Sequence, residues 1–263
     1  MTAGPDRPAF LLVHGAWHGA WCWDAVRAAL DAEGWRSHAV DLPSSAPVGS
    51  VPARSDGTRP AGLAEDAAAV RDHLRRIDGP VVVVAHSYGG APVTEAIAGA
   101  PNVVRAVYLA AFQLDAGESL FSFLGTPAPA DDTGHTPPDE DARQVFFADV
   151  PGAEADRAVA RLTPQSVRSF TEPVRTAGWR TVPSSYVVCE HDRALEPSRQ
   201  RVLAARADTV HRLPSSHSPF LSMPGELAAL LAGIAGTGRR SDRRSDGRGG
   251  PDGGPAHRAV RSS

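Results

Sequence analysis

The stretch that decides the fold is Val81-Val82-Val83-Val84-Ala85-His86-Ser87-Tyr88-Gly89-Gly90. The four valines predict a buried strand, and the serine among small residues predicts a sharp turn that leads into a helix. A turn this tight strains the serine backbone, so the residues two before and two after it must be small. Ala85 and Gly89 meet that requirement. Such a nucleophile elbow exposes the Ser87 hydroxyl at the top of a sheet, at the positive end of the following helix.

The same segment is also compatible with an ordinary strand, turn and helix in which Ser87 only caps the helix. A serine nucleophile needs a base, an acid that orients the base, and hydrogen-bond donors for the oxyanion. The two interpretations therefore differ in whether the rest of the chain supplies these groups.

A second apolar run, residues 10–13, ends in the motif His14-Gly15-Ala16-Trp17. In this kind of fold the loop after such a strand donates one oxyanion N–H, and the residue after the nucleophile donates the other. We expect the backbone amides of Ala16 and Tyr88 to be these donors. Trp17 adjoins the first of them and is expected to contact the substrate.

The orienting acid is expected at the end of a later strand, residues 185–189, which runs into Glu190-His191-Asp192. The carboxyl ends of parallel strands meet at one edge of a sheet, where ligands bind. We favour Asp192 because it lies past the strand end, where its side chain can turn toward a histidine. Glu190 is the alternative.

The base is expected on the loop after the last short strand, residues 210–213. His217 lies on that loop, ahead of a predicted helix over residues 224–234. His191 immediately neighbours the acid and His211 lies inside the strand, so both are weaker candidates. His217 is therefore the predicted general base.

Taken together, these segments resemble one branch of a known family. The stretch His14-Gly15-Ala16-Trp17-His18-Gly19-Ala20-Trp21-Cys22-Trp23 is similar to the start of the plant methylesterases and hydroxynitrile lyases of the α/β-hydrolase superfamily, and of their bacterial relatives. The resemblance implies Ser87, Asp192 and His217 as the catalytic triad, with Ala16 and Tyr88 as oxyanion donors. Further matches are residues 39–43, 85–90, 106–112, 188–192 and 216–220.

One departure from this branch bears on the chemistry. Its lyase members resemble the esterases but carry a lysine directly after the catalytic histidine, where the cation stabilises the leaving cyanide. Here that position is Ser218, and the chain contains no lysine. Ester hydrolysis needs no such cation, so the sequence favours an esterase.

The composition is typical of a globular enzyme domain. The chain has 263 residues, of which 42% are hydrophobic and 22% charged, close to globular averages. Its formal net charge of −3 argues against nucleic acid as a partner. Residues 1–8 lack the pattern of a signal peptide, and no apolar run approaches the ~20 residues of a membrane span. We therefore expect a cytoplasmic protein that does not bind membranes.

The chain has two cysteines, Cys22 and Cys189. They are too few for a disulfide framework or a metal site, and both are expected to be buried thiols. Triad chemistry needs neither a metal nor an organic cofactor, so none is expected. The expected partner is a small ester substrate, and the oligomeric state stays open, with a homodimer as one option.

The chain divides into three predicted parts. Alternating strands and helices in residues 1–112 and 181–235 predict an α/β fold, with a mostly parallel sheet and helices on both faces. Residues 113–180 fall between two core strands, where α/β-hydrolases carry a cap, and are expected to form an inserted helical cap. Residues 236–263, nearly all Gly, Arg, Ser, Asp and Pro, are expected to be a disordered tail. Further expected elements are strands over 35–40 and 103–110 and helices over 23–33, 63–77, 88–98, 142–147, 154–162 and 166–174.

Ser87, Asp192 and His217 together predict a serine hydrolase, most simply a carboxylic ester hydrolase that forms an acyl-enzyme. Two alternatives stay open. One is a lactone or C–C bond hydrolase, or a lyase, on the same site, and the other is a ligand-binding homologue without turnover. The cap supplies further pocket candidates, most of them expected to pack its own small core: Phe121, Phe123, Leu124, Phe146, Phe147, Phe170 and Trp179.

Overall fold

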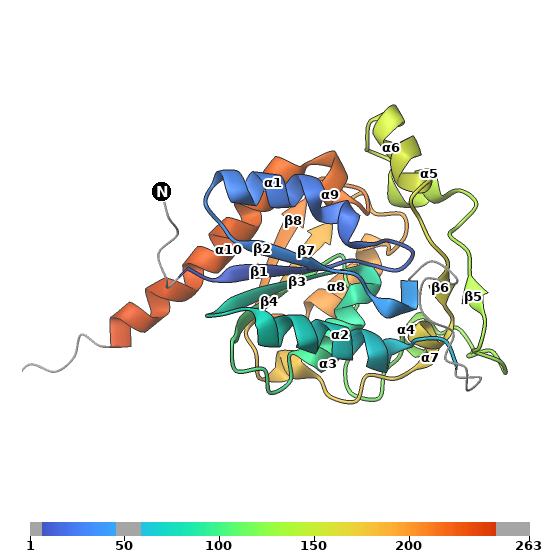
Figure 1. Cartoon of the computed structure of the whole chain (residues 1–263), viewed down its shortest axis with the longest axis horizontal. Helices are drawn as coiled ribbons and strands as arrows, with labels where there is room; N and C mark the ends of the chain where they lie inside the picture. The colour runs from blue at the N-terminus through green and yellow to red at the C-terminus, as the bar shows by residue number, and fades with distance from the viewer. Residues whose placement is uncertain (1–6, 46–58, 246–263) are drawn as a thin grey trace, which may run out of the picture.

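Six parallel strands form the main sheet of the computed structural model, which describes residues 7–45 and 59–245, with side chains as far as residue 236. The strand order is β2-β1-β3-β4-β7-β8 (Figure 1). Every neighbouring pair is parallel, which confirms the predicted α/β fold. The strands are β1 (Ala9–Val13), β2 (Ser37–Val40), β3 (Val81–His86), β4 (Val103–Leu109), β7 (Ser184–Cys189) and β8 (Thr209–Leu213).

The central strands are apolar along their length because helices cover both faces of the sheet. Leu11 of β1 packs in one hydrophobic cluster and Leu12 in the other. Val83 and Val84 of β3 repeat this alternation. Successive side chains of a strand point to opposite faces, so a strand buried on both sides has a continuous apolar run. The four valines ahead of Ser87 are such a strand.

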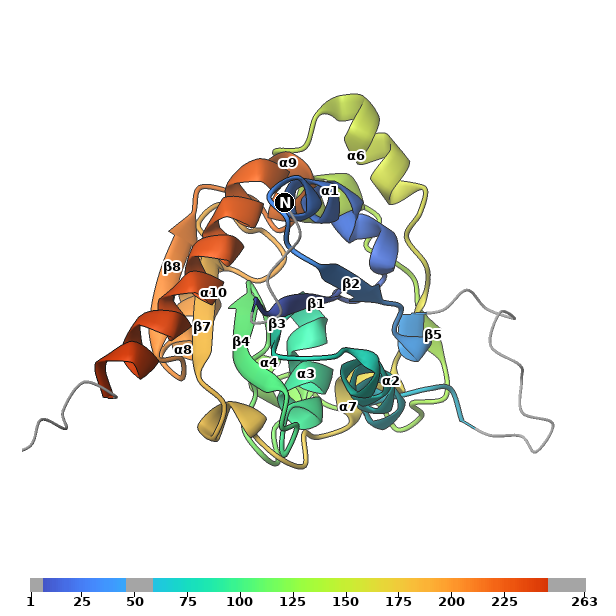
Figure 2. The ribbon, with the colours of Figure 1, turned by 60° about the vertical axis from the view of Figure 1, so that its left-hand side comes forward.

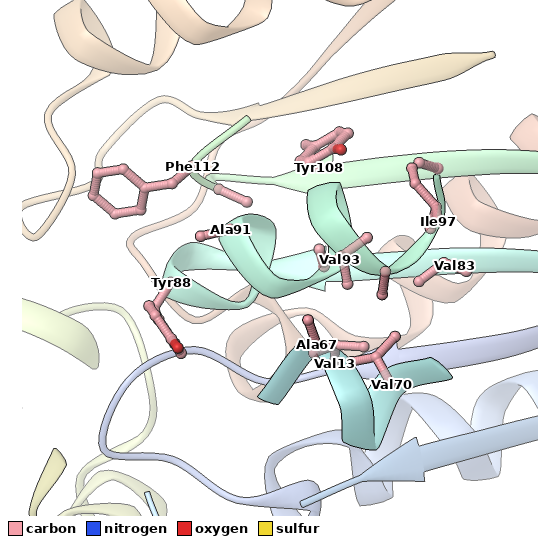
Figure 3. Packing of buried hydrophobic residues seen from close by; sticks show 14 of the residues in the cluster. Val13, Ala67, Val70, Val83, Tyr88, Ala91, Val93, Ile97, Tyr108 and Phe112 are labelled. Carbon is pink, nitrogen blue, oxygen red and sulfur yellow. The ribbon is translucent and has the colours of Figure 1, made fainter. Parts of the chain in front are cut away.

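Helices α1 and α10 cover one face of the sheet, whereas α2, α3 and α8 cover the other (Figure 1). Figure 3 shows part of the second layer, in which Val70 of α2 and Val93 of α3 pack in one cluster with Val83 of β3. The helix expected over 88–98 begins as a 3₁₀ turn, η3 (Ser87–Gly89), and continues as α3. The bounds are α1 (Asp24–Ala32), α2 (Leu63–Arg76), α3 (Gly90–Ala96), α8 (Pro197–Ala204), α9 (Pro219–Ser222) and α10 (Pro224–Ser245), with 3₁₀ turns η1 (Ala20–Trp23) and η2 (Pro43–Ser45).

The strand order reverses between β1 and β3. From β1 the chain passes through α1 to β2 on one side, and then through α2 to β3 on the other side of β1. Such a reversal opens a crevice outside the carboxyl ends of the two strands, where ligands of open α/β sheets bind. The loop after β1 and the turn after β3 therefore meet at the position expected for a site.

Between β4 and β7 the chain leaves the sheet and forms a region of short elements beyond the carboxyl ends of the strands (Figure 1). Figure 2, a second view, places α6 and β5 of this region on the outside of the molecule. The expected helices are present in shorter form, and β5 and β6 pair antiparallel. The elements are α4 (Leu120–Leu124), β5 (His135–Thr136), α5 (Ala142–Phe146), α6 (Gly152–Val159), β6 (Gln165–Ser166), α7 (Arg168–Thr171) and η4 (Gly178–Arg180).

Helix α4 lies in a stretch of the chain that is rich in Pro, Gly and Asp. Ser119 caps it by accepting the Ser122 N–H at 3.1 Å, and Gly125 ends it with a left-handed φ of 72°. A serine N-cap and a terminal glycine are strong local signals for a helix. Here they outweigh the average composition of the segment.

Helix α10 runs past residue 236, where the predicted tail begins, and ends at Ser245. Its first part is anchored on the sheet, because Leu227 and Leu231 are fully buried there. Extending an existing helix avoids the cost of a new nucleus, and arginine is a good helix former. Residues 246–263, the remainder of the predicted tail, lie outside the described residues.

The two cysteines, Cys22 and Cys189, are buried and free, as predicted. Burial raises the pKa of both thiols well above the ordinary value, so they are protonated and unreactive. None of the described helices is long and apolar enough to cross a membrane.

Candidate active site

Ser87 lies at the turn between β3 and α3 with a positive φ of 49°. A non-glycine residue with this backbone conformation is strained and persists only where its surroundings hold it. Gly89 and Gly90 make the turn possible, since a Cβ on Gly89 would collide with the His14 carbonyl oxygen and one on Gly90 would lie 2.7 Å from the Phe112 amide nitrogen. The glycines after the serine thus let the helix start against neighbouring backbone.

Gly15 brings the loop after β1 against this turn. A Cβ at residue 15 would lie 2.8 Å from the Ser87 Cβ and 2.9 Å from His86 Nδ1. No side chain fits at that separation, so glycine is required where the two segments meet. The structure thereby places the Ala16 amide region and Ser87 side by side.

A Gly15→Ala variant is expected to lower kcat/KM about 100-fold, because the added methyl group displaces either Ser87 or the loop that carries Ala16. Overpacking of this kind also costs about 1–3 kcal/mol of stability. The matched control is Gly225→Ala, where a Cβ has no neighbour within 4 Å. Thermal unfolding and kcat/KM measured for both variants check this, and an active Gly15→Ala enzyme would contradict it.

His14 fixes the direction of the Ala16 N–H. His14 Nε2 accepts the Leu42 N–H at 3.0 Å, so its proton is on Nδ1, which donates to the Gly15 carbonyl at 2.8 Å. Burial lowers the pKa of His14 and keeps the ring neutral. In a trans peptide the C=O and N–H point in opposite directions. Holding the Gly15 carbonyl therefore orients the amide of Ala16, the predicted oxyanion donor.

The next peptide is held in the same way. His18 Nδ1 bonds the Ala16 carbonyl at 2.8 Å, and the Trp17 N–H donates to Gln165 Oε1 at 3.2 Å. Burial lowers the pKa of His18 to about 3, so this ring is also neutral. Trp17 has a positive φ of 62°. Two neutral histidines and one glutamine thus hold a strained loop in a single conformation.

Asp192 and His217 form a buried pair. His217 Nδ1 lies 2.7 Å from Asp192 Oδ2, with both side chains almost fully buried. Asp192 Oδ1 accepts the amides of Ala194 and Leu195 at 2.8 and 2.9 Å. Oδ2 also accepts Gln200 Nε2 at 2.9 Å. Four donors on two oxygens define an ionised carboxylate that holds the imidazole with its proton on Nδ1.

The rival residues lie elsewhere. Glu190 is exposed and pairs with Arg212 at 3.4 Å. His191 is exposed, and His211 lies on β8 at the edge of the sheet. The structure therefore brings His217 together with Asp192 and not with Glu190.

The Ser87 turn is connected to the His217–Asp192 pair through His86, the residue before the serine. The His86 Nε2 bonds the His217 carbonyl at 2.9 Å, and the two rings lie 4.5 Å apart. Among the hydrogen bonds of the described residues, none joins the Ser87 hydroxyl to His217. Catalytic hydrogen bonds without substrate are often long and tighten in the complex.

Aromatic side chains surround the predicted donors. Trp17 lies 5.6 Å, centroid to centroid, from both Phe146 and Phe170. Phe146 also lies 5.8 Å from His217, and Phe170 lies 5.7 Å from Tyr88. The region between β4 and β7 thus contributes rings on either side of Trp17. Of the remaining candidates, Phe121 packs on Phe170, Phe123 on Phe112 and Phe147 on Phe146, and Trp179 donates to the Leu114 carbonyl.

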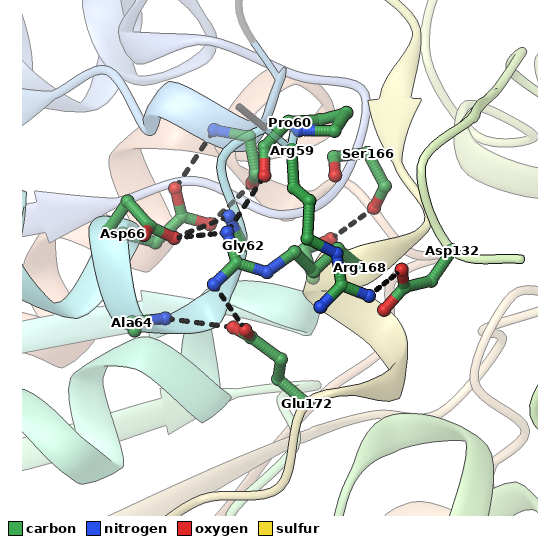
Figure 4. Close-up of polar contacts among 12 residues, drawn as sticks. Arg59, Pro60, Gly62, Ala64, Asp66, Asp132, Ser166, Arg168 and Glu172 are labelled. Carbon is green, nitrogen blue, oxygen red and sulfur yellow. Dashed lines mark hydrogen bonds and ion pairs between the residues drawn. The ribbon is translucent and has the colours of Figure 1, made fainter. Parts of the chain in front are cut away.

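Two further groups attach this region to the core beside the site. Arg168 of α7 donates to the carbonyl of Pro60, just before α2, at 3.0 Å (Figure 4). The same guanidinium pairs with Glu172 at 2.6 Å. Glu172 in turn accepts the Ala64 N–H at 3.2 Å. Arg59 and Asp132 form an exposed pair nearby. The first turn of α2 is therefore held by Arg168 of α7 and by Glu172, the residue that follows this helix.

Asp149, a residue that the sequence did not single out, holds the loop of His217. Its Oδ2 accepts the Ser216 N–H at 2.8 Å, and its Oδ1 accepts the Ser216 hydroxyl. Burial acts to raise the pKa of Asp149, but hydrogen bonds from Ser216, together with smaller contributions from Ser222 and the Asp149 backbone, outweigh it and the pKa is lowered. Its only sequence signal is a position between two helices, so this contact was not predictable.

An Asp149→Ala variant is expected to lower kcat about tenfold, because the segment next to His217 loses two hydrogen bonds that position it. Asp149→Asn keeps one acceptor oxygen and is expected to restore part of the rate. Asp156→Ala, which removes only an exposed pair with Arg143, is the control. Equal rates for all three variants would show that Asp149 does not position the histidine.

No group of three or more His, Cys, Asp or Glu side chains in the described part of the chain is arranged to hold a metal ion. Four buried histidines nevertheless lie close together, at positions 14, 18, 86 and 217. One nitrogen of each ring bonds a backbone carbonyl or Asp192, and His14 Nε2 accepts the Leu42 N–H. The His18 Nε2 and His86 Nδ1 atoms have no hydrogen-bond partner among the described residues. The cluster is therefore a scaffold around the base.

Comparison with known proteins agrees with this architecture. Residues 10–230 match the model of the alpha/beta hydrolase family. A pyrethroid hydrolase of Sphingobium wenxiniae is 30% identical over 251 residues, which cover 86% of this chain and 86% of the relative. Methylesterase 1 of Arabidopsis thaliana is 27% identical over 261 residues, covering 89% of this chain and 98% of the relative.

A solved structure shows the same arrangement of the backbone. The methylesterase MES16 from Arabidopsis superimposes with a TM-score of 0.74 at 26% identity, covering 88% of this chain and 99% of that chain. The family match spans most of the chain, from the first strand into the last helix. The chain therefore belongs to the alpha/beta hydrolase family and is a hydrolase enzyme, as its sequence motifs predict.

Proposed function

We propose that this protein is a serine esterase that cleaves small carboxylic esters through an acyl-enzyme. The observation that carries the proposal is the buried His217–Asp192 pair, 2.7 Å apart, beside the strained Ser87 turn. In the proposed reaction His217 Nε2 takes the Ser87 proton while the serine oxygen attacks the ester carbonyl carbon. Asp192 keeps the proton on Nδ1 and stabilises the imidazolium.

The carbonyl oxygen becomes an oxyanion that accepts hydrogen bonds from the backbone N–H groups of Ala16 and Tyr88. Such a donor is worth about 3 kcal/mol in the transition state, and here the loop conformation that presents Ala16 is fixed by His14 and His18. The C–O bond then breaks, and the alcohol leaves with the proton from His217. Water, activated by the same histidine, hydrolyses the acyl-enzyme and restores Ser87.

The relatives support ester chemistry, since they include a pyrethroid hydrolase, a carbendazim hydrolyzing esterase and methylesterases. Residues 113–180 act as a cap in this proposal. Phe146 and Phe170 of this region, which pack on Trp17, provide apolar surface beside the proposed oxyanion donors and in this proposal favour esters with an apolar acyl or alcohol group. Cytoplasmic location and a homodimer stay predictions.

The test is steady-state hydrolysis of a panel of p-nitrophenyl esters and methyl aryl esters by the purified protein. We expect turnover of short or aromatic esters and a preference among chain lengths that sizes the pocket. A folded protein that turns over no ester would overturn the proposal in favour of a lactone or C–C bond hydrolase, or of a ligand-binding protein.

A further inference from the structure

A carboxylate on helix α2 is buried beneath the predicted oxyanion donors. Asp66 is fully buried, and among the described residues no cation pairs with it. Its neighbour Glu65, on the same helix, points outward and pairs with Arg168 at 3.2 Å. An isolated carboxylate in the interior is costly unless hydrogen bonds satisfy it. The groups that satisfy Asp66 are therefore informative.

Three donors converge on Asp66. The Ser44 N–H donates to Oδ1 at 2.9 Å, and the Ser44 hydroxyl donates to Oδ2. The Tyr88 hydroxyl also donates to Oδ2, at 2.5 Å. Burial raises the pKa of Asp66 to about 7, while the hydrogen bonds from Ser44 and Tyr88 oppose the shift. The carboxylate is consequently the main form on the alkaline side of neutrality.

The hydrogen bonds continue from Ser44 into the region between β4 and β7. Gln165 Nε2 donates to the Ser44 hydroxyl at 2.7 Å and to the Ser169 hydroxyl at 2.7 Å. The Ser169 hydroxyl in turn donates a hydrogen bond to the Ser166 carbonyl at 2.7 Å. The donors of the Gln165–Ser44 branch thus lead to Asp66, which is the terminal acceptor of that branch, whereas the Gln165–Ser169 branch ends at the Ser166 carbonyl. An acceptor-only carboxylate fits this polarity, whereas an amide at position 66 opposes one of its donors with an N–H.

Both ends of the network reach segments that present oxyanion donors. Tyr88 supplies the predicted donor with its backbone N–H, and its side chain is anchored on Asp66. Gln165 Oε1 accepts the Trp17 N–H at 3.2 Å, next to Ala16 on the other segment. Figure 3 shows Tyr88 where the chain enters α3, at the end of the helix opposite Ile97. One carboxylate is therefore linked to both sides of the oxyanion site.

We propose that Asp66 is a positioning residue of the active site, which holds the Tyr88 segment directly and the Trp17 segment through Ser44 and Gln165. Its carboxylate sets the distance between the backbone N–H groups of Ala16 and Tyr88. Because Gln165 of β6 and Ser169 of α7 belong to the same network, that distance also depends on how β6 and α7 pack against the core. This proposal rests on the proposed function, because it assumes that an oxyanion forms between those donors.

The experiment compares Tyr88→Phe, Asp66→Asn and Tyr108→Phe with the wild-type protein at pH 8. Tyr88→Phe deletes one hydroxyl of the network and leaves the backbone donor in place. Tyr108→Phe is the matched control, since it deletes another buried tyrosine hydroxyl, bonded to Thr94 at 2.9 Å, away from both donor segments. The readout is the second-order rate of Ser87 labelling by a fluorophosphonate, whose P–O oxygen occupies the oxyanion position and which requires no knowledge of the substrate. Thermal unfolding and, with the best ester, kcat and KM are measured in parallel.

We expect Tyr88→Phe and Asp66→Asn to label Ser87 about 10- to 100-fold more slowly, with kcat reduced and KM nearly unchanged, and Tyr108→Phe to label like the wild type. Folded Tyr88→Phe protein that labels within twofold of the wild type overturns the inference, even if Asp66→Asn does not fold. The inference is also overturned if Tyr88→Phe and Tyr108→Phe lose the same fraction of the labelling rate, because an equal loss reflects reduced stability alone. Labelling of the wild type without ester turnover refutes only the ester substrate class, whereas an inert wild-type Ser87 overturns the proposed function and this inference together.

Discussion

A Ser87→Ala variant is expected to fold normally and to lose ester hydrolysis by roughly 10⁶-fold in kcat. The substitution removes only the Oγ atom and leaves the helix start, the oxyanion amides and the His217–Asp192 pair unchanged. Alanine is also less demanding than most residues at the strained φ of 49°. Activity is measured with the best ester of the panel, in the linear phase, after removal of trace contaminating esterase.

The matched control is Ser166→Ala. Ser166 is fully buried and its hydroxyl has no hydrogen-bond partner among the residues that the structure describes, so the variant deletes the same atom from an interior serine without touching the triad. Circular dichroism and thermal unfolding should show both variants folded, and Ser166→Ala should retain the wild-type rate. More than about 1% residual activity in Ser87→Ala, with clean protein, would assign the chemistry to another group.

The sequence was sufficient where local patterns decide the structure. Apolar strand runs such as the valines of β3, alternating with helical segments, predicted the parallel sheet, confirmed here. The triad residues themselves were predicted from position relative to strand ends. Since carboxyl ends of parallel strands share one edge of the sheet, separate segments of sequence can be assigned to one site.

Long-range polar contacts were beyond the reach of such patterns. Gln200, which bonds Asp192 from α8, and Asp149, which holds Ser216, have no local signature. Asp66 did carry a signal, because it lies three residues after Leu63, on the buried face of α2. A charged residue at an apolar-face position indicates a buried network, but its partner Tyr88 is identified only once the helices are packed.

An Asp192→Asn variant is expected to lower kcat about 10⁴-fold, the cost of the same exchange in a serine protease triad. The amide must place its oxygen toward the Ala194 and Leu195 N–H groups, which both donate to Oδ1. Its NH₂ then faces Gln200 Nε2 and His217 Nδ1, where Oδ2 accepted both. His217 Nδ1 has to become an acceptor, so the proton moves to Nε2, and the lone pair that takes the Ser87 proton is lost.

Two controls separate this tautomer effect from a general loss of structure. Asp208→Asn makes the same exchange at the opposite end of β7, where the Asp208 carboxylate accepts the Ser184 N–H at 2.7 Å. An asparagine oxygen can still accept that bond, so wild-type activity is expected. Glu190→Gln removes the rival acid, which is exposed and paired with Arg212, and is likewise expected to have wild-type activity.

If the kcat of Asp192→Asn stays within tenfold of the wild-type value, His217 does not depend on Asp192 for its tautomer. If kcat falls in Glu190→Gln and not in Asp192→Asn, the orienting role belongs to Glu190 at the end of the strand. Because all three variants exchange one carboxylate for an amide, only the geometry around each side chain distinguishes the expected rates.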